Sequence, residues 1–132
     1  MERRPNQTFA QFSSHQIVCI EGKTAFLYGE VIQVIVKRQL CWARPLLLAK
    51  FSDVSITPIT NFPTTEQIID LREGSDLLLP LSLFRPALDT EIIPLITQLN
   101  SIDSSLKDKH IASKQLNSFI HQVWQANFNS DR

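Results

Sequence analysis

The sequence predicts a single α+β domain: a small, strongly bent antiparallel sheet or an SH3-like barrel, followed by a C-terminal amphipathic helix. The chain of 132 residues is 43% hydrophobic and 20% charged, which suits one globular domain with its own core. Its first part is rich in β-branched residues, and its last part has apolar residues at helical spacing. We expect a flexible arm at 1–14, strands within 15–88 and helices within 89–128.

The most β-prone part of the chain comes first. QIVCIEG (16–22) predicts a strand that glycine ends, and residues 24–51 predict a hairpin that turns at its only polar break, KRQ (37–39). Gly29 inside the hairpin indicates a bulge or a sharp bend. Pro45 lacks a backbone donor, so the returning strand is an edge strand there or its pairing ends.

The middle of the chain is less regular. Residues 52–65 hold two prolines and many Ser and Thr, which predicts a loop or a short strand. The apolar runs 67–71 and 76–84 predict two further strands joined by the turn REGS. Asp89 occupies an expected helix cap, and Pro94 predicts that the following helix is short, kinked or partly irregular.

The C-terminal segment has the clearest periodicity. At about 100° per residue, five apolar side chains spaced i, i+3, i+4, i+7 and i+8 make one stripe on a helix. They are Leu116, Phe119, Ile120, Val123 and Trp124. We expect a helix over 105–127 that packs this stripe across the sheet or over an open barrel end.

The charges balance overall but not along the chain. Thirteen basic and thirteen acidic residues leave no net charge that would attract nucleic acid or an anionic membrane. Residues 1–50 hold seven Lys and Arg against three Asp and Glu, whereas residues 51–103 hold two against eight. Such a gradient marks a partner-facing surface or, more often, unlike surfaces that attract each other within the fold.

Nothing in the sequence predicts a membrane segment. No apolar run approaches the roughly 18 residues of a membrane helix, and the polar N-terminus lacks the apolar core of a signal peptide. We therefore expect a cytoplasmic protein that does not bind membranes.

Carboxylates are concentrated in DLREGSDLLLPLSLFRPALD (70–89), without a catalytic pattern. They lie at expected turns and caps, and no histidine, cysteine or glycine-rich loop stands beside them in the sequence. The repeated spacing Arg-x-x-x-Asp favours ion pairs between strands instead of acid–base chemistry. The residues concerned are Asp70, Arg72, Glu73, Asp76, Arg85 and Asp89.

Other reactive residue types are also badly spaced for chemistry. Cys19 and Cys41 are too far apart for a CxxC redox pair or a thiolate metal site, and both lie in apolar runs where a thiol acts as a small hydrophobe. With three glycines the chain has no phosphate-binding loop. We expect no enzymatic activity, no catalytic residue, no metal and no cofactor.

Two binding surfaces can be predicted. Trp42, Arg44 and Arg85 are of the types that dominate protein contacts, which indicates binding to another protein. The alternative combines cations with an aromatic ring for single-stranded nucleic acid, although the acidic middle of the chain would repel it. That set is Lys37, Arg38, Trp42, Arg44 and Lys50.

Two stretches, CWARPLLLAK (41–50) and DLREGSDLLLPLSLFRPALDTEIIPLITQL (70–99), resemble small uncharacterised proteins encoded in cyanobacterial genomes. The resemblance covers residues 15–100 and implies a cytosolic protein of a photosynthetic bacterium. Its motifs are tied to no chemistry, so no functional residue is carried over. The function that we expect is a non-enzymatic interaction module, an adaptor or an assembly or regulatory factor. A small-barrel nucleic-acid-binding protein is the alternative.

Overall fold

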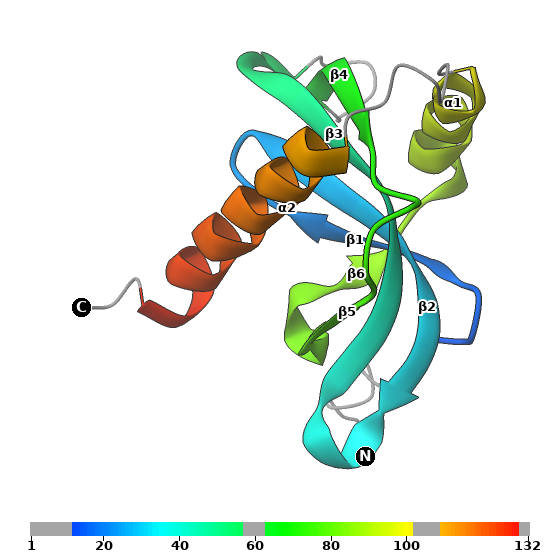
Figure 1. Ribbon diagram of the computed structural model, residues 1–132, viewed down its shortest axis with the longest axis vertical. Helices are drawn as coiled ribbons and strands as arrows, with labels where there is room; N and C mark the ends of the chain where they lie inside the picture. The colour runs from blue at the N-terminus through cyan, green and yellow to red at the C-terminus, as the bar shows by residue number, and fades with distance from the viewer. Residues whose placement is uncertain (1–11, 57–62, 102–108, 130–132) are drawn as a thin grey trace.

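The structure is a computed structural model that describes residues 12–56, 63–101 and 109–129. Across these residues six antiparallel strands form one sheet, and two α-helices pack on it (Figure 1). The α+β prediction is confirmed, and because the sheet is not closed it is the bent sheet, not the barrel, that forms. In chain order the elements are β1 (Ile17–Glu21), β2 (Ala25–Ile35), η2 (Val36–Arg38), β3 (Leu40–Ile56), β4 (Pro63–Asp70), β5 (Leu77–Pro80), η3 (Leu81–Leu83), β6 (Arg85–Pro86), α1 (Asp89–Asn100), α2 (Lys109–Trp124) and the π-helical turn η5 (Gln125–Asn129).

The sheet is organised around β3, its longest strand. The strand order is β4-β3-β2-β1-β6, and β5 also pairs with β3. β3 pairs with β5 through residues 40–43 and with β4 through residues from Leu47 onward. Pro45 lies in the interval between these two partners, where a missing backbone donor costs no ladder bond. The hairpin predicted to turn at Lys37-Arg38-Gln39 is confirmed, with η2 as its turn.

A bulge bends the sheet at Gly29, as predicted. The pairing of β2 with β3 shifts register between Tyr28 and Gly29. A Cβ atom on Gly29 would lie 3.0 Å from the carbonyl oxygen of Arg44, so a side chain there would push the two strands apart. The sheet curls so far that β5 and β6, although they pair with different strands, are separated in the chain only by η3 and Phe84.

α2 covers one face of this bent sheet, which we call the inner face. Three side chains of the predicted stripe, Leu116, Phe119 and Val123, are buried there, and Ile120 packs at the margin. They contact a cluster contributed by β1, β2 and β3. Trp124 does not belong to the stripe, because it is 41% exposed and its ring packs on Phe128 with centroids 4.5 Å apart.

The position of Trp124 has a simple geometric reason. At about 100° per residue it lies about 100° around the helix from the centre of the buried stripe, beyond the part that the sheet can cover. The predicted start of the helix, at residue 105, lies outside the described residues.

α1 covers the opposite face, which we call the outer face. Its buried residues Ile92, Leu95 and Leu99 pack on Cys19, Tyr28, Leu47 and Ala49. Neighbouring residues along a strand point to opposite faces, so Cys19 meets α1 while Ile20 meets α2. The two helices therefore enclose the same part of the sheet, and the β2–β3 hairpin extends beyond both of them (Figure 1).

The structure corrects four local predictions. The helix α1 is 12 residues long and continues through Pro94, which lies on its exposed side. Its N-cap is Leu88, not Asp89. The composition of 52–65 predicts a loop or a short strand, but β3 continues to residue 56 and β4 starts at residue 63, because the two strands pair with each other. The predicted strand 76–84 is shorter than expected, because β5 ends at Pro80 and residues 81–83 form the helical turn η3.

The first residues of the expected N-terminal arm lie outside the described part of the chain. From residue 12 onward the arm contacts the domain: Phe12 packs against a third apolar cluster that contains Val18 and Val31. The Oγ of Ser14 donates a hydrogen bond to the carbonyl oxygen of Ile32 at 3.2 Å. No helix in the described part is long and apolar enough to cross a membrane.

The packing of α2 predicts a large effect of one substitution. The Phe119 ring is 5% exposed and lies against Gly22, where a Cβ atom would approach the ring to 2.6 Å. Phe119→Ala should lower the free energy of unfolding by about 3 kcal/mol, because it removes a buried ring and leaves a cavity. The neighbouring exposed residue supplies the control: Ser118→Ala should change it by less than about 0.5 kcal/mol. Urea unfolding measures both, and equal values would contradict the packing.

Candidate functional site

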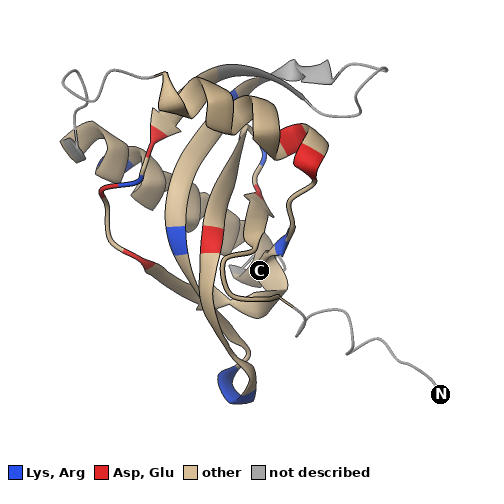
Figure 2. Cartoon of the chain, turned by 90° about the vertical axis from the view of Figure 1, so that its right-hand side faces the viewer, with Lys and Arg blue, Asp and Glu red and all other residues tan. Residues whose placement is uncertain are grey.

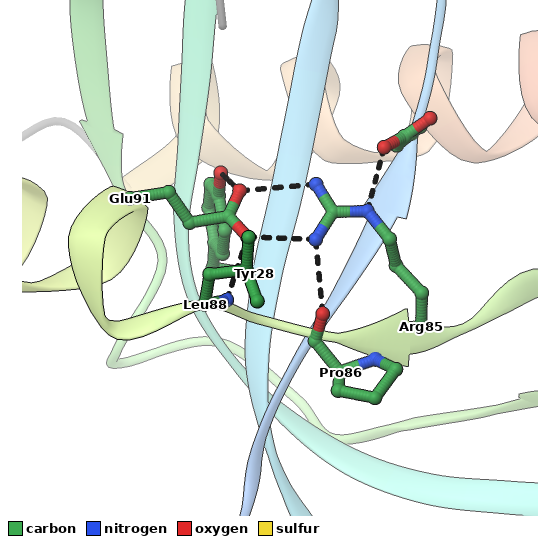
Figure 3. A network of polar contacts seen from close by, with 6 residues as sticks. Tyr28, Arg85, Pro86, Leu88 and Glu91 are labelled. Atoms are coloured by element: carbon green, nitrogen blue, oxygen red, sulfur yellow. Dashed lines mark hydrogen bonds and ion pairs between the residues drawn. The ribbon is translucent and has the colours of Figure 1, made fainter. Parts of the chain in front are cut away.

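A network of polar side chains fastens α1 to the sheet (Figure 3). The Arg85 guanidinium binds the Glu91 carboxylate with both of its terminal nitrogens, Nη1 to Oε2 at 2.7 Å and Nη2 to Oε1 at 3.0 Å. Its Nε donates to Glu21 Oε2 at 2.6 Å, and Nη1 also donates to the carbonyl oxygen of Pro86 at 2.9 Å. Paired forks of this kind are strong and orient both side chains.

The Glu91 carboxylate is buried, and both of its oxygens accept further hydrogen bonds. The Tyr28 hydroxyl donates to Oε1 at 2.5 Å, and the Leu88 N–H donates to Oε2 at 2.7 Å. Glu91 is the third residue of α1, the position from which a glutamate reaches back to the N-cap backbone. Burial by itself would raise the pKa of Glu91, but the bonds from Arg85, Leu88 and Tyr28 hold it below its ordinary value of 4.5.

The chemistry open to this network is limited. Burial raises the pKa of the Tyr28 hydroxyl and raises that of the Cys19 thiol to about 12, so neither is ionised at neutral pH. Glu91 is ionised and occupied on both oxygens, so it is not poised as a proton acceptor near pH 7. One arginine faces two glutamates, which leaves an excess negative charge and disfavours an anionic ligand.

A second arginine reaches the other end of α1. The Asp70 side chain is 2% exposed and binds Arg72, with Nη2 to Oδ2 at 2.9 Å and Nε to Oδ1 at 3.0 Å. Arg72 Nη1 also donates to Asn100 Oδ1 at 3.2 Å, in the last residue of α1. Each end of α1 is therefore tied to the sheet through one arginine.

The carboxylates of the 70–89 stretch do not converge on one point. Asp70 binds Arg72, and Asp76 lies beside Arg44 and Trp42, whereas Asp89 begins α1. The arginines thus have partners other than those expected from the Arg-x-x-x-Asp spacing. Within the described ranges, no three His, Cys, Asp or Glu residues lie close enough together to hold a metal ion.

The surface also has hollows. One of about 200 Å³ lies between the β4–β5 turn and α2, and Asp70, Ser113 and Asn117 line it together with apolar residues. The carboxylate of Asp70 faces Arg72 there. Burial raises the pKa of Cys41 to about 11, so its thiol is a small apolar group, as expected, and Cys19 is buried in a different cluster.

An exposed group of side chains lies on the outer face of the sheet. We call it the Trp42 surface; its members are Trp42, Arg44, Asp76 and Leu78. Trp42 and Arg44 share this face because they alternate with the buried residues 41, 43 and 45. The indole Nε1 of Trp42 donates to Asp76 Oδ2 at 3.1 Å, and Arg44 Nε lies 3.5 Å from Asp76 Oδ1. Leu78 is directly opposite Trp42 in the pairing of β5 with β3.

The remaining predicted cations are distributed over three places. Lys37 and Arg38 are exposed in η2, at the end of the hairpin farthest from the helices (Figures 1 and 2). Lys50 lies toward the other end of the hairpin, and its Nζ donates to Gln115 Oε1 of α2 at 3.3 Å. Arg85 is on β6, three strands away from Trp42 in the order of the sheet, and its guanidinium is bound to Glu21 and Glu91. The structure therefore brings together Trp42 and Arg44, with Lys37 and Arg38 nearby, but not Lys50 or Arg85.

No protein-family profile, curated protein sequence or solved structure matches this chain. The site is therefore inferred from its own residues. Sequence reasoning missed Leu78, Tyr28 and Glu91 as participants. Glu91 lies three residues after the observed N-cap Leu88, a position that the cap expected at Asp89 does not give, and Leu78 and Tyr28 depend on strand pairing that no local pattern encodes.

The two glutamates on Arg85 predict a contrast in stability. Glu91→Ala should lower the free energy of unfolding by about 3 kcal/mol, because it leaves a partly buried guanidinium, a hydroxyl and the Leu88 N–H without their acceptor. Glu21→Ala removes an exposed carboxylate from the same arginine and should cost less than about 1 kcal/mol. Chemical denaturation of the two variants checks this, and similar losses would show that α1 is not held by Glu91.

The lowered pKa of Glu91 predicts how stability depends on pH. A carboxyl group with a lower pKa in the folded chain contributes fully above its unfolded value, about 4.5, and loses this contribution as the pH falls through the folded value. The stability difference between the wild type and Glu91→Gln should therefore be largest above pH 4.5 and should shrink below it. Urea unfolding between about pH 7 and pH 3 measures this difference. A difference that stays constant over the range would rule out the linkage.

Proposed function

We propose that this chain is a non-enzymatic protein-interaction module, an adaptor or an assembly or regulatory factor, and that it binds another protein through the Trp42 surface. The observation that carries the proposal is the exposure of two large apolar side chains side by side, Trp42 at 37% and Leu78 at 53%. Large exposed apolar groups that lie together mark contact sites more often than single ones do.

The Trp42 surface has the properties of a prepared binding site. Its side chains stand on paired strands, and the Trp42 ring is oriented by its hydrogen bond to Asp76. A partner therefore loses little free energy in ordering these groups, which leaves more of the contact energy for affinity. Tryptophan and arginine are also the residue types that most often dominate such contacts.

Three features support a module without catalysis. The ionised carboxylates described above are bound by arginines, the two thiols are buried with raised pKa values, and the buried network joins elements of the fold. From the resemblance of residues 15–100 to small cyanobacterial proteins, we further propose that the protein acts in the cytosol of a photosynthetic bacterium.

Nucleic-acid binding is the second candidate, because Lys37, Arg38, Trp42 and Arg44 belong to one hairpin. It is the weaker candidate, since Asp76 already contacts both Trp42 and Arg44, and Lys50 lies toward the other end of the hairpin, where it contacts Gln115. Binding of single-stranded oligonucleotides with a steep salt dependence, lost in the variant Lys37→Ala/Arg38→Ala/Arg44→Ala, would favour it.

The proposal predicts a selective loss of binding. In affinity purification from the source organism, proteins that bind the Trp42 surface should be retained by the wild type and lost with Trp42→Ala or Leu78→Ser. With the purified partner, the dissociation constant should rise at least about tenfold, because a central anchor has been removed.

The chain supplies a matched control. Trp124 is exposed to a similar degree, 41% against 37% for Trp42, but lies on α2. Trp124→Ala should retain the same partners. The proposal is wrong if no protein is captured specifically, or if Trp42→Ala binds every captured protein as tightly as the wild type.

A further inference from the structure

We infer that the partner of the Trp42 surface presents an extended, acidic segment, with one apolar side chain on Trp42 and Leu78 and carboxylates beside Lys37 and Arg38. The inference rests on the proposed function and adds the chemistry and the spacing of the ligand.

The apolar part of the surface is continuous across two strands. The Leu81 N–H donates to the Gln39 carbonyl oxygen at 2.8 Å, which fixes the hydrogen-bond pattern of β5 and β3. In this pattern Trp42 and Leu78 form a non-hydrogen-bonded pair, the kind in which opposite side chains lie closest. Because the indole N–H is occupied by Asp76, a ligand meets the ring and the leucine rather than a donor.

The charged part lies at the end of the hairpin. In the described part of the chain, Lys37 and Arg38 form no ion pair with a carboxylate, whereas Arg44 has Asp76 beside it. The hairpin end therefore has two positive charges that no carboxylate of the described residues neutralises, next to Val36, which is 55% exposed. Carboxylates on a partner complement these charges and also steer its approach.

The distance between the two parts sets the spacing of the ligand. From Trp42 the strand advances two residues to Leu40, where β3 begins, about 7 Å at 3.4 Å per residue, and Gln39 then leads into the turn η2 that holds Lys37 and Arg38. An extended segment that follows this path reaches the turn with about three residues of its own. Its carboxylates should therefore stand about three positions from its apolar anchor.

Two carboxylates on the same face favour a protein segment over a nucleic acid. Asp76 lies beside Arg44, and Glu30 is the cross-strand neighbour of Arg44 in the pairing of β2 with β3. A chain of phosphates that continued from the hairpin end past Trp42 would meet both of them. A segment with localised carboxylates places its charge only at the hairpin end.

Selection from a random peptide library displayed on phage, with the whole chain immobilised, tests the inference. Enriched peptides should carry Asp or Glu about three positions from Leu, Phe or Trp. Synthetic copies should bind at least about tenfold more weakly to Lys37→Glu/Arg38→Glu, because attraction becomes repulsion. Lys114→Glu, an exposed charge reversal on α2, should bind them like the wild type.

The outcomes separate the inference from the proposed function. If the selected peptides lose binding to Trp42→Ala but are not acidic, or bind the hairpin double variant normally, the surface is a protein-binding site and the inferred ligand chemistry is wrong. If they bind Trp42→Ala normally, or if nothing is selected, both are wrong. Tight binding of oligothymidylate that competes with the peptides would also overturn the inference.

Discussion

The ion pair between Arg85 and Glu91 is the interaction on which the arrangement of the domain depends. Glu91 lies in the first turn of α1 and Arg85 on the short strand β6, so the pair fixes the helix over the outer face of the sheet. A buried carboxylate is costly unless its hydrogen bonds are complete, and Tyr28 and the Leu88 N–H complete them. The ion pair of Arg85 and Glu91 thus positions a helix.

The bend of the sheet separates the part that gives stability from the part that is available for binding. The bulge at Gly29 and the length of β3 let one half of the sheet lie between the two helices, where the apolar clusters are. The other half extends past the helices as a hairpin (Figure 1). Its outer face therefore keeps large side chains such as Trp42 in contact with water, although the backbone beneath them is fully paired with β2 and β5.

This division gives the exposed residues a particular role. Trp42 and Leu78 do not fill a core, and their removal should leave both helix-covered clusters intact. Arginine is a residue type favoured at protein contacts, but the guanidinium of Arg85 already forms ion pairs with two glutamates of the same chain. Residue type alone therefore does not separate contact residues from structural ones; what separates them is whether the fold already satisfies the side chain.

The sequence by itself determined the elements whose signals are local. The β-branched runs, the turn at Lys37-Arg38-Gln39 and most of the α2 stripe follow from the local pattern of residues, and the bulge at Gly29 follows from the missing side chain of that residue. Only the tertiary structure decided which charges pair and which apolar groups stay exposed. Tyr28 and Glu91 are 63 residues apart, and Leu78 meets Trp42 only because β5 pairs with the first part of β3. Such contacts depend on which strands become neighbours, and the spacing of residues along one segment carries no information about that.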